Sequence, residues 1–495
     1  MRAVGKLMSM AAFSLLSLTG CVMVQPEAIT DVALMQQARL DRTRVSQEVP
    51  PLVLELTLDE ALARALKYNT GVRTRMMEQA LELNQLDVNN YDMLPAMLSQ
   101  AGYTSRNNDR ISQSRDSATG EESPSRFISQ EKDHVLSNAG VSWSLLDLGM
   151  GYYNAQQQGD RVVIAYERRR KAMHLVKQDV HIAFWRAASA QQMEGEVRDA
   201  IEMAESALRD ARQAELELVS DPVENLRYQR QLLENLRLLE AIRQELSTAQ
   251  IELAALINAP LGVTIRVNEP DMILNAQLLQ VSIETMEEIT MGQNADIREQ
   301  HYNASIARLE VRKTLVGLFP NLSFDYNINY DTDRFLVNSN WDQIGAQLSF
   351  NLFSLLSAPA RLNLAESGVV LADQRRMAMQ MAVLAQLHLA RLQFANSIGQ
   401  FRRAEQIWDA DRRLLAQVTN REEARLQSTL DVINSETAAL LSLLRRYQAW
   451  AETQASLARL EYTLGTEAPI GNVSEMSLEE LIQQIQMFKE MDYRS

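Results

Sequence analysis

The chain has 495 residues, of which 46% are apolar, 6% aromatic and 23% charged, with 18 Gly and 11 Pro. A chain of this length can bury a sizeable core, and the low aromatic, Gly and Pro content favours long helices over compact α/β domains. The net charge of −15 argues against a nucleic-acid partner, because phosphate binding needs a basic surface. The sequence has no HExxH motif, phosphate-binding Gly loop or nucleophile elbow, so we predict no catalytic residue, metal site or cofactor.

Residues 1–20 have the pattern of a secretory signal. A positively charged start precedes an apolar run, Leu7 to Leu18, that is too short to span a bilayer. Leu18-Thr19-Gly20-Cys21 resembles the bacterial lipoprotein cleavage motif, which would make Cys21 the acylated first residue and residues 21–54 an N-terminal linker. The alternative is a secretory signal with an incidental cysteine. By resemblance to that class, Val22 after the cysteine favours sorting to the outer membrane.

The rest of the chain contains an internal duplication. Three positions of the first copy match positions of the second copy that lie 225 residues later: Leu58, Asn69 and Pro95 match Ile283, Asn294 and Pro320. Further along, the offset falls to 207 or 208, because residues 96–142 form a longer excursion than residues 321–349. We therefore expect a first repeat at 55–265, a second at 266–467 and an unassigned tail at 468–495.

Each repeat is predicted to contain a long helical hairpin, at about 152–258 and 360–465. No proline lies between Pro124 and Pro222 or between Pro359 and Pro469, and an internal proline costs a helix about 3 kcal/mol. The first arm of each hairpin would be on the order of 100 Å long. Leucines spaced by three, four or seven residues from Leu232 onward predict a return helix packed in coiled-coil fashion.

The segments between the helical tracts alternate between apolar and polar residues, as strands do. We predict strand pairs at about 96–146 and 321–353, with a polar, exposed loop at 107–130. No run of 18 apolar residues follows the signal, so a membrane crossing would have to be a β-barrel. Four strands cannot close a barrel, so several copies would share one. The alternative is a soluble strand hairpin packed on a helical bundle.

The order of these elements resembles the TolC-like outer-membrane efflux factors. The resemblance covers roughly residues 55–467 and rests on three short motifs in their order and spacing: Leu56-Thr57-Leu58-Asp59-Glu60-Ala61-Leu62 with Asn69 seven residues on, Leu94-Pro95 and Phe319-Pro320 before the strand pairs, and Leu145-Leu146-Asp147. It implies a mainly α fold with a membrane β-barrel: a homotrimer in which four strands per chain make a twelve-stranded barrel and the hairpins form a periplasmic tunnel.

The resemblance also implies a function. Such proteins are passive exit ducts in the outer membrane, which receive substrate from an inner-membrane pump through a periplasmic adaptor and need no cofactor. The exported substrate could be a drug, a metal ion or a polypeptide, and the sequence does not distinguish these. Two alternatives of other classes are a periplasmic coiled-coil adaptor or scaffold lipoprotein without a channel, and an enzyme with a helical-bundle site.

The family's closed pore is held at the periplasmic tip, where two aspartates one turn apart form a constriction. The resemblance places Asp431 on the first and Asn434 on the second, so the second charge is missing. Three Asp431 side chains around an axis would form an anionic ring. Alternatively, Asp431 only occupies the first turn of a helix, where the helix dipole favours it. The tip turns are expected at Asp221 and Pro222, which read as a helix cap and first helical residue, and at Ser428.

Aromatic residues gather where the strand pairs meet the helices. They are Trp143, Tyr152, Tyr153, Phe350 and Phe353. They could form the aromatic girdle at the membrane interface, although core packing under the barrel is an alternative.

Overall fold

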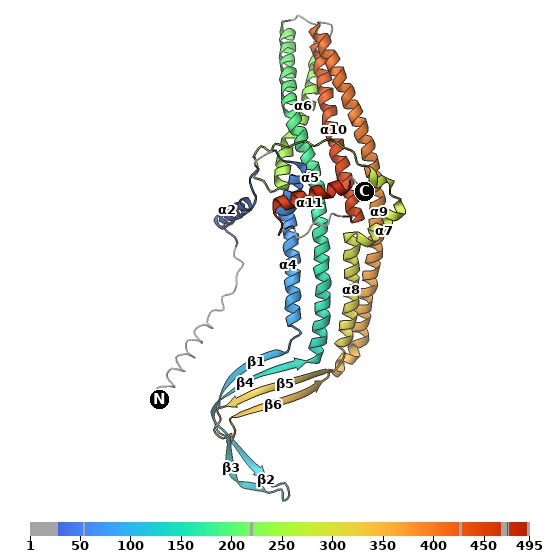
Figure 1. Ribbon diagram of the computed structural model, residues 1–495. Coiled ribbons are helices and arrows are strands. Elements are labelled where there is room, and N and C mark those ends of the chain that lie inside the picture. Colours follow the sequence, from blue (N-terminus) through green and yellow to red (C-terminus); the bar gives the residue numbers. More distant parts are fainter. Residues whose placement is uncertain are drawn as a thin grey trace. The chain divides into compact units, whose positions relative to one another are not determined.

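Figure 1 shows a computed structural model of the chain, which describes residues 28–52, 55–217, 221–424, 428–466, 473 and 475–492. The predicted signal and Cys21 lie outside the described residues. Contacts divide the chain into two units, Met1–Pro50 and Pro51–Ser495. The first unit contains α2 (Asp31–Glu48), whose N-terminus is capped by the side chain of Thr30. All other elements named below belong to the second unit.

The duplication seen in the sequence is preserved in the helix lengths. The short helices α3 (Leu58–Tyr68) and α7 (Ile283–Gln293) have 11 residues each, and α4 (Thr70–Tyr91) and α8 (Ala295–Val316) have 22 each. The long helices α5 (Leu145–Leu216) and α9 (Leu352–Glu423) have 72 each, and their return helices α6 (Pro222–Leu256) and α10 (Thr429–Leu464) have 35 and 36. A helix of 72 residues is about 110 Å long. Among the described residues, no helix is both long and apolar enough to cross a membrane.

Both long helices begin about seven residues earlier than expected. The side chain of Ser144 caps α5 by accepting a hydrogen bond from the backbone N–H of Asp147 at 3.1 Å, so Leu145-Leu146-Asp147 is a first helical turn. Helix α9 contains Pro359 in its third turn, although the sequence predicts that the helix begins after this proline. Helix α9 therefore continues through this proline, although the missing N–H removes one backbone hydrogen bond.

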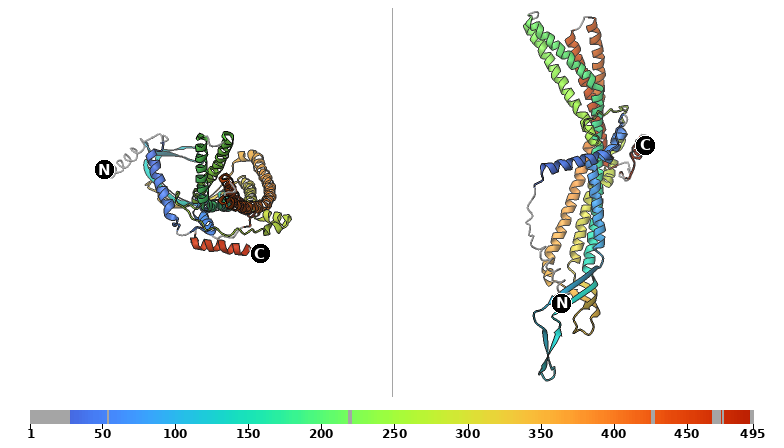
Figure 2. Two further views of the ribbon diagram at one scale, coloured as in Figure 1. Left: turned by 90° about the horizontal axis from the view of Figure 1, so that it is seen from above. Right: turned by 90° about the vertical axis from the view of Figure 1, so that its left-hand side faces the viewer.

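Four strands form one antiparallel sheet in the order β1-β4-β5-β6 at the end of the helices opposite the hairpin turns (Figures 1 and 2). The strands are β1 (Ala96–Ser105), β4 (Asp133–Ser144), β5 (Asn321–Asp331) and β6 (Asn340–Ser349). The segment expected to be a loop instead contains a separate hairpin of β2 (Arg110–Arg115) and β3 (Glu122–Gln130). Its polar composition hid the strands, and its turn is held by Asp116, which accepts a hydrogen bond from the N–H of Ala118 at 2.8 Å.

The core of the second unit joins both repeats. The predicted leucine seam of α6 is confirmed, since Leu232, Leu239 and Leu253 are fully buried. Beside it, an aromatic cluster connects α5, α9 and α10: the rings of Trp185 and Trp450 lie 5.7 Å apart edge to face, and that of Phe401 lies 4.9 Å from Trp450.

The tail is docked on this core through helix α11 (Leu478–Asp492), which runs across the long helices in Figure 1. Its residues Leu481 and Ile485 are buried, and the helix packs against α3. The ammonium group of Lys67 on α3 donates to the carbonyl of Met476 just before α11. A further short 3-10 helix, Gln277–Gln280, precedes α7.

Gly465 ends α10 at φ +74°, and a Cβ there would lie 2.5 Å from the carbonyl oxygen of Gln293. Gly465→Ala therefore adds a clash to the roughly 1–2 kcal/mol that a left-handed conformation costs other residues. We expect Gly465→Ala to lower the midpoint of thermal unfolding, followed by circular dichroism, more than Gly262→Ala does. Gly262 is the control because its φ is +88° but no atom lies within 4 Å of a Cβ there. Equal losses would contradict the clash.

Candidate functional site

The first hairpin turn is closed by a capped helix start, as the sequence predicts. One carboxylate oxygen of Asp221 accepts hydrogen bonds from the N–H groups of Val223 at 2.9 Å and Glu224 at 3.1 Å, and Pro222 is the first residue of α6. Glu224 in the first turn pairs with Arg227 at 2.8 Å. The buried amide of Asn225 donates to the carbonyl of Ala211 at 2.9 Å, which ties α6 to α5 one turn below the tip.

The second hairpin turn is closed by a capping box between Ser428 and Asp431. The N–H of Asp431 donates to the Ser428 hydroxyl oxygen at 3.3 Å, and the N–H of Ser428 donates to the Asp431 carboxylate at 3.3 Å. The Ser428 hydroxyl also donates to that carboxylate at 2.7 Å. Asp431 thus lies in the first turn of α10, as one of the two alternatives expects. Its place in a pore constriction stays a prediction.

Asn434 faces the other repeat within the same chain. The amide of Asn235, which is buried on α6, donates to the side-chain oxygen of Asn434 on α10 at 2.6 Å. This hydrogen bond lies between the two hairpins, about one turn from Asp431. Asn434 is half-buried, so its assignment to a constriction also stays a prediction.

Further from the tip, a half-buried carboxyl of α10 lies close to two carboxylates of α5. Burial raises the pKa of the Glu436 carboxyl above its ordinary value, and the charges of Glu196 and Asp199 raise it further. This cluster of three carboxyls could not be predicted from the sequence, because only the packing of α5 on α10 brings the residues together.

In the middle of the molecule, one asparagine per repeat joins three helices. The side-chain oxygen of Asn69 accepts from the N–H groups that begin α4, and its amide donates to the carbonyl of Leu256 in the last turn of α6 at 3.2 Å. Asn294 does the same for α8 and donates to the carbonyl of Thr463 in α10 at 2.9 Å. These residues marked the duplication in the sequence, but their bonding partners were not predicted.

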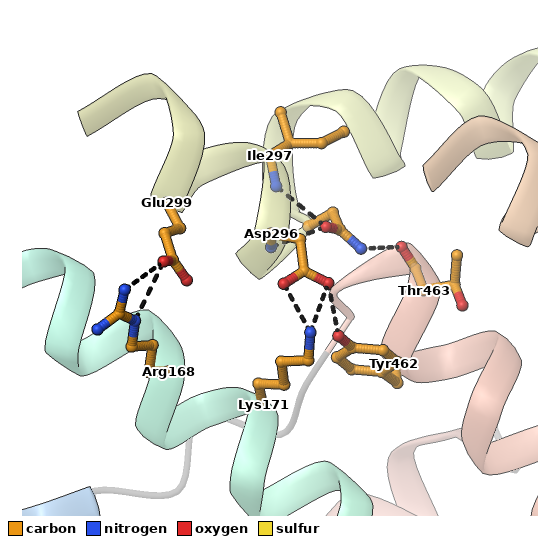
Figure 3. Close-up of polar contacts among 8 residues, drawn as sticks. Arg168, Lys171, Asp296, Ile297, Glu299, Tyr462 and Thr463 are labelled. Carbon is orange, nitrogen blue, oxygen red and sulfur yellow. Dashed lines mark hydrogen bonds and ion pairs between the residues drawn. The ribbon is translucent and has the colours of Figure 1, made fainter. Parts of the chain in front are cut away.

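Ion pairs surround the second of these asparagines (Figure 3). Asp296 accepts from the ammonium group of Lys171 at 2.8 and 3.1 Å and from the hydroxyl of Tyr462 at 2.9 Å. Arg168 on α5 pairs with Glu299 on α8 at 2.7 Å. These contacts hold the second repeat against the long helix of the first. Among the described residues, no group of three or more acidic, histidine or cysteine side chains could hold a metal ion.

The sheet end presents an apolar face that is exposed in the described part of the chain. On β5, Phe324, Tyr326 and Ile328 alternate with polar residues, as predicted, and each is more than 40% exposed. The register places four apolar side chains in one row across the sheet: Met97, Val141, Tyr326 and Ile344. The row is open at both ends, where Met97 is 82% and Ile344 83% exposed.

The predicted interface aromatics lie between this sheet and the long helices. Trp143, Tyr152, Phe350 and Phe353 are exposed, whereas Tyr153 is half-buried with its ring 5.5 Å from that of Tyr152. Four of the five are thus not packed in the core of this chain. Their role in a membrane girdle stays a prediction.

No family model matches the sequence, and no curated protein matches it either. Solved structures do match its fold. The outer-membrane channel OprN is 16% identical with a TM-score of 0.63, over 83% of this chain and 90% of that one. The open state of the MtrE outer-membrane channel of Neisseria gonorrhoeae is 15% identical with a TM-score of 0.64, over 82% and 88%. The CmeC outer-membrane channel of Campylobacter jejuni is 14% identical with a TM-score of 0.64, over 86% and 88%.

The chain shares the fold of these outer-membrane channels. The two helical hairpins and two strand pairs expected from the sequence are confirmed, whereas the trimer and the closed barrel stay predictions. The hairpins α5–α6 and α9–α10 reach one end of the second unit and the strands lie toward the other, while α4 and α8, which begin at the two asparagines, lie between them (Figure 1). Local caps at the tips were predicted from the sequence, whereas Asn235, Glu436 and the partners of Asn69 and Asn294 were not.

Replacing Asn294 separates its two roles. Asn294→Ala removes the cap and the bond to Thr463, so we expect it to cost about 1–3 kcal/mol of stability. Asn294→Asp keeps the cap but turns a buried donor into an acceptor that faces the Thr463 carbonyl, so it should destabilise as well. The exposed helix cap Asn351→Ala serves as control, because it loses a cap alone. The midpoint of thermal unfolding is measured for all three purified variants. An Asn294→Asp variant as stable as wild type would contradict a stabilising role of the bond to Thr463.

Glu436 should make the hairpin pair sensitive to pH. A carboxyl whose folded pKa is raised destabilises the fold when ionised, and this penalty disappears as pH falls through the raised pKa. Glu436→Gln should therefore unfold at a higher temperature than wild type at pH 7.5. The gain should shrink on acidification and vanish below the ordinary value of 4.5. Glu202→Gln, an exposed change on α5, is the control. A gain that does not depend on pH would contradict the electrostatic origin.

Proposed function

We propose that this protein is the outer-membrane channel of a tripartite export system and acts as a passive exit duct. The observation that carries the proposal is the combination of the TolC-like fold with an apolar sheet face that no described residue covers. In this role the protein performs no catalysis and needs no cofactor. Transport would be driven by an inner-membrane pump, whose substrate reaches the channel through a periplasmic adaptor.

The strands have the dimensions that a transmembrane barrel needs. They contain 10, 12, 11 and 10 residues, and a tilted transmembrane strand needs roughly 9–11. The outer strands β1 and β6 each pair on one side only, and unpaired strand edges are not tolerated in lipid. Three chains would close a barrel of twelve strands, within the range of bacterial barrels. The apolar row from Met97 to Ile344 would then face lipid.

The same three-fold assembly would turn the helical parts into a tube. Two repeats of equal helix lengths in each chain give six similar units around one axis. The hairpin tips would meet at the periplasmic end, where Asp431 is proposed to form the constriction with Asn434 nearby. Acylation of Cys21 would add a lipid anchor, and the exposed aromatics would mark the membrane interface.

The alternative of a coiled-coil scaffold without a channel is not favoured. The channels named above match more than four fifths of this chain. A scaffold would also leave the apolar sheet face without a partner, and such a face is an aggregation hazard in water.

Two measurements test the proposal. After membrane fractionation, the protein should be found in the outer membrane and should migrate on native gels as a trimer that heating dissociates. In planar bilayers, the purified trimer should produce ion conductance. A soluble monomer, or a trimer that shows no ion conductance, would overturn the proposal.

The role of Asp431 can be separated from its role in the capping box. Asp431→Ala should reduce cation selectivity in bilayer recordings, because it removes one negative charge per chain from the tip. Ser428→Ala breaks the same capping box while keeping the charge, so it is the matched control. Equal effects of both substitutions would assign Asp431 to capping alone, and unchanged selectivity in Asp431→Ala would remove it from the constriction.

A further inference from the structure

A cavity of about 900 Å³ lies between α5, α8 and α9 in the half of the helices that is nearer the sheet. Its volume is that of a site for a drug-sized molecule. Its wall includes Met150 from α5, Ile306 from α8 and Leu364 and Leu371 from α9. Both leucines are more than half exposed, although they lie on a helix face that points into a cavity. The cavity therefore offers an apolar wall that the residues described by the structure leave exposed.

The charge of the cavity is opposite to that of the chain. Five cationic side chains and two carboxylates line it: Arg161, Arg168, Lys313, Arg361 and Arg375, with Glu299 and Glu310. Each carboxylate is already paired, Glu299 with Arg168 and Glu310 with Lys313, both at 2.7 Å. Among the described residues, no carboxylate lies within ion-pair distance of the remaining three arginines. An excess of three positive charges thus gathers in a protein whose net charge is −15.

The internal repeat supplies a comparison for one of these arginines. Arg168 on α5 corresponds to Arg375 on α9, 207 residues later. Arg168 is surrounded by the carboxylates of Glu299, Glu78 and Glu82, which raise the pKa of its guanidinium. At the offset of 225 residues that relates α4 to α8, Glu78 and Glu82 correspond to Asn303 and Ala307.

Asn303 and Ala307 both line the cavity. The second repeat has therefore kept the arginine but replaced two acidic residues that surround it in the first. A carboxylate near an exposed guanidinium contributes at most about 1 kcal/mol, so this change alters the charge of the cavity wall more than the stability of the fold. Among the described residues, Arg375 has no carboxylate within ion-pair distance.

We propose that this cavity binds an amphiphilic organic anion, with Arg161, Arg361 and Arg375 holding its acidic group and the leucines of α9 contacting its apolar body. Guanidinium groups suit this task, because they remain charged at any physiological pH and bind carboxylate, sulfonate or phosphate oxygens with two parallel hydrogen bonds. As a statement about the exported substrate, the inference rests on the proposed function.

Binding can be measured without transport. The protein in nanodiscs of zwitterionic lipid is titrated into dansylglycine, which is an anion with an aromatic body, and fluorescence polarisation is recorded against protein-free nanodiscs. The neutral dansylglycinamide is the matched probe. We expect dansylglycine to bind more tightly than the amide, and Arg161→Gln/Arg361→Gln/Arg375→Gln to weaken its binding about tenfold or more.

A triple variant with the same change of charge is the control. Arg209→Gln/Arg227→Gln/Arg237→Gln alters three exposed arginines, each of which pairs with a glutamate on its own helix outside the cavity, and it should bind dansylglycine like wild type. Lysine at the three cavity positions should restore binding at pH 7 but lose it as pH approaches about 10.4, where wild type still binds. Equal binding of acid and amide, or equal losses in both glutamine variants, would overturn the proposal.

Bilayer recordings of the same preparation separate this inference from the proposed function. A protein that conducts ions but does not distinguish the two probes retains the channel function and loses the anion site. A protein that binds the acid selectively but never conducts retains the site and loses the channel.

Discussion

The architecture depends on one asparagine in each repeat that satisfies two helix ends at once. A helix start leaves N–H groups without acceptors, and a helix end leaves carbonyls without donors. The amide side chains of Asn69 and Asn294 offer both an oxygen and an NH₂ group, so each caps the helix that follows it and binds a carbonyl of the return helix. Aspartate would lack the donor.

This double contact explains how a helix of 72 residues is accompanied over most of its length. Helix α5 packs with α4 over one part and with α6 over another, and α9 packs likewise with α8 and α10. The two helices that pack along each long helix meet near the asparagine. Without this junction, one continuous helix would be needed to accompany the long helix. The ion pairs of Asp296 and Glu299 then hold the second repeat on α5, so the two halves of the chain keep a common register.

The sequence predicted those features that depend on neighbours along the chain. Asp221 and Ser428 cap helices through residues two or three positions away, and the alternation of β5 is visible in its own residues. The partners of Asn69 and Asn294 lie 187 and 169 residues away and are backbone carbonyls, which have no signature in the sequence. Pro359 is a related case. Its local propensity predicts that the helix begins after it, whereas α9 begins at Leu352 and includes it.

The same distinction applies to the candidate sites. Asp431 was singled out by a motif, yet the side chains that surround Asn434 and Glu436 come from the other repeat, so neither the Asn235 bond nor the carboxylates of α5 could be anticipated. Where two copies of one unit share a wall, their differences carry the information about function. The two repeats share an arginine, Arg168 and Arg375, but Glu78 and Glu82 of the first repeat correspond to Asn303 and Ala307 in the second. The structure shows that these second-repeat residues, on α8 and α9, line one cavity.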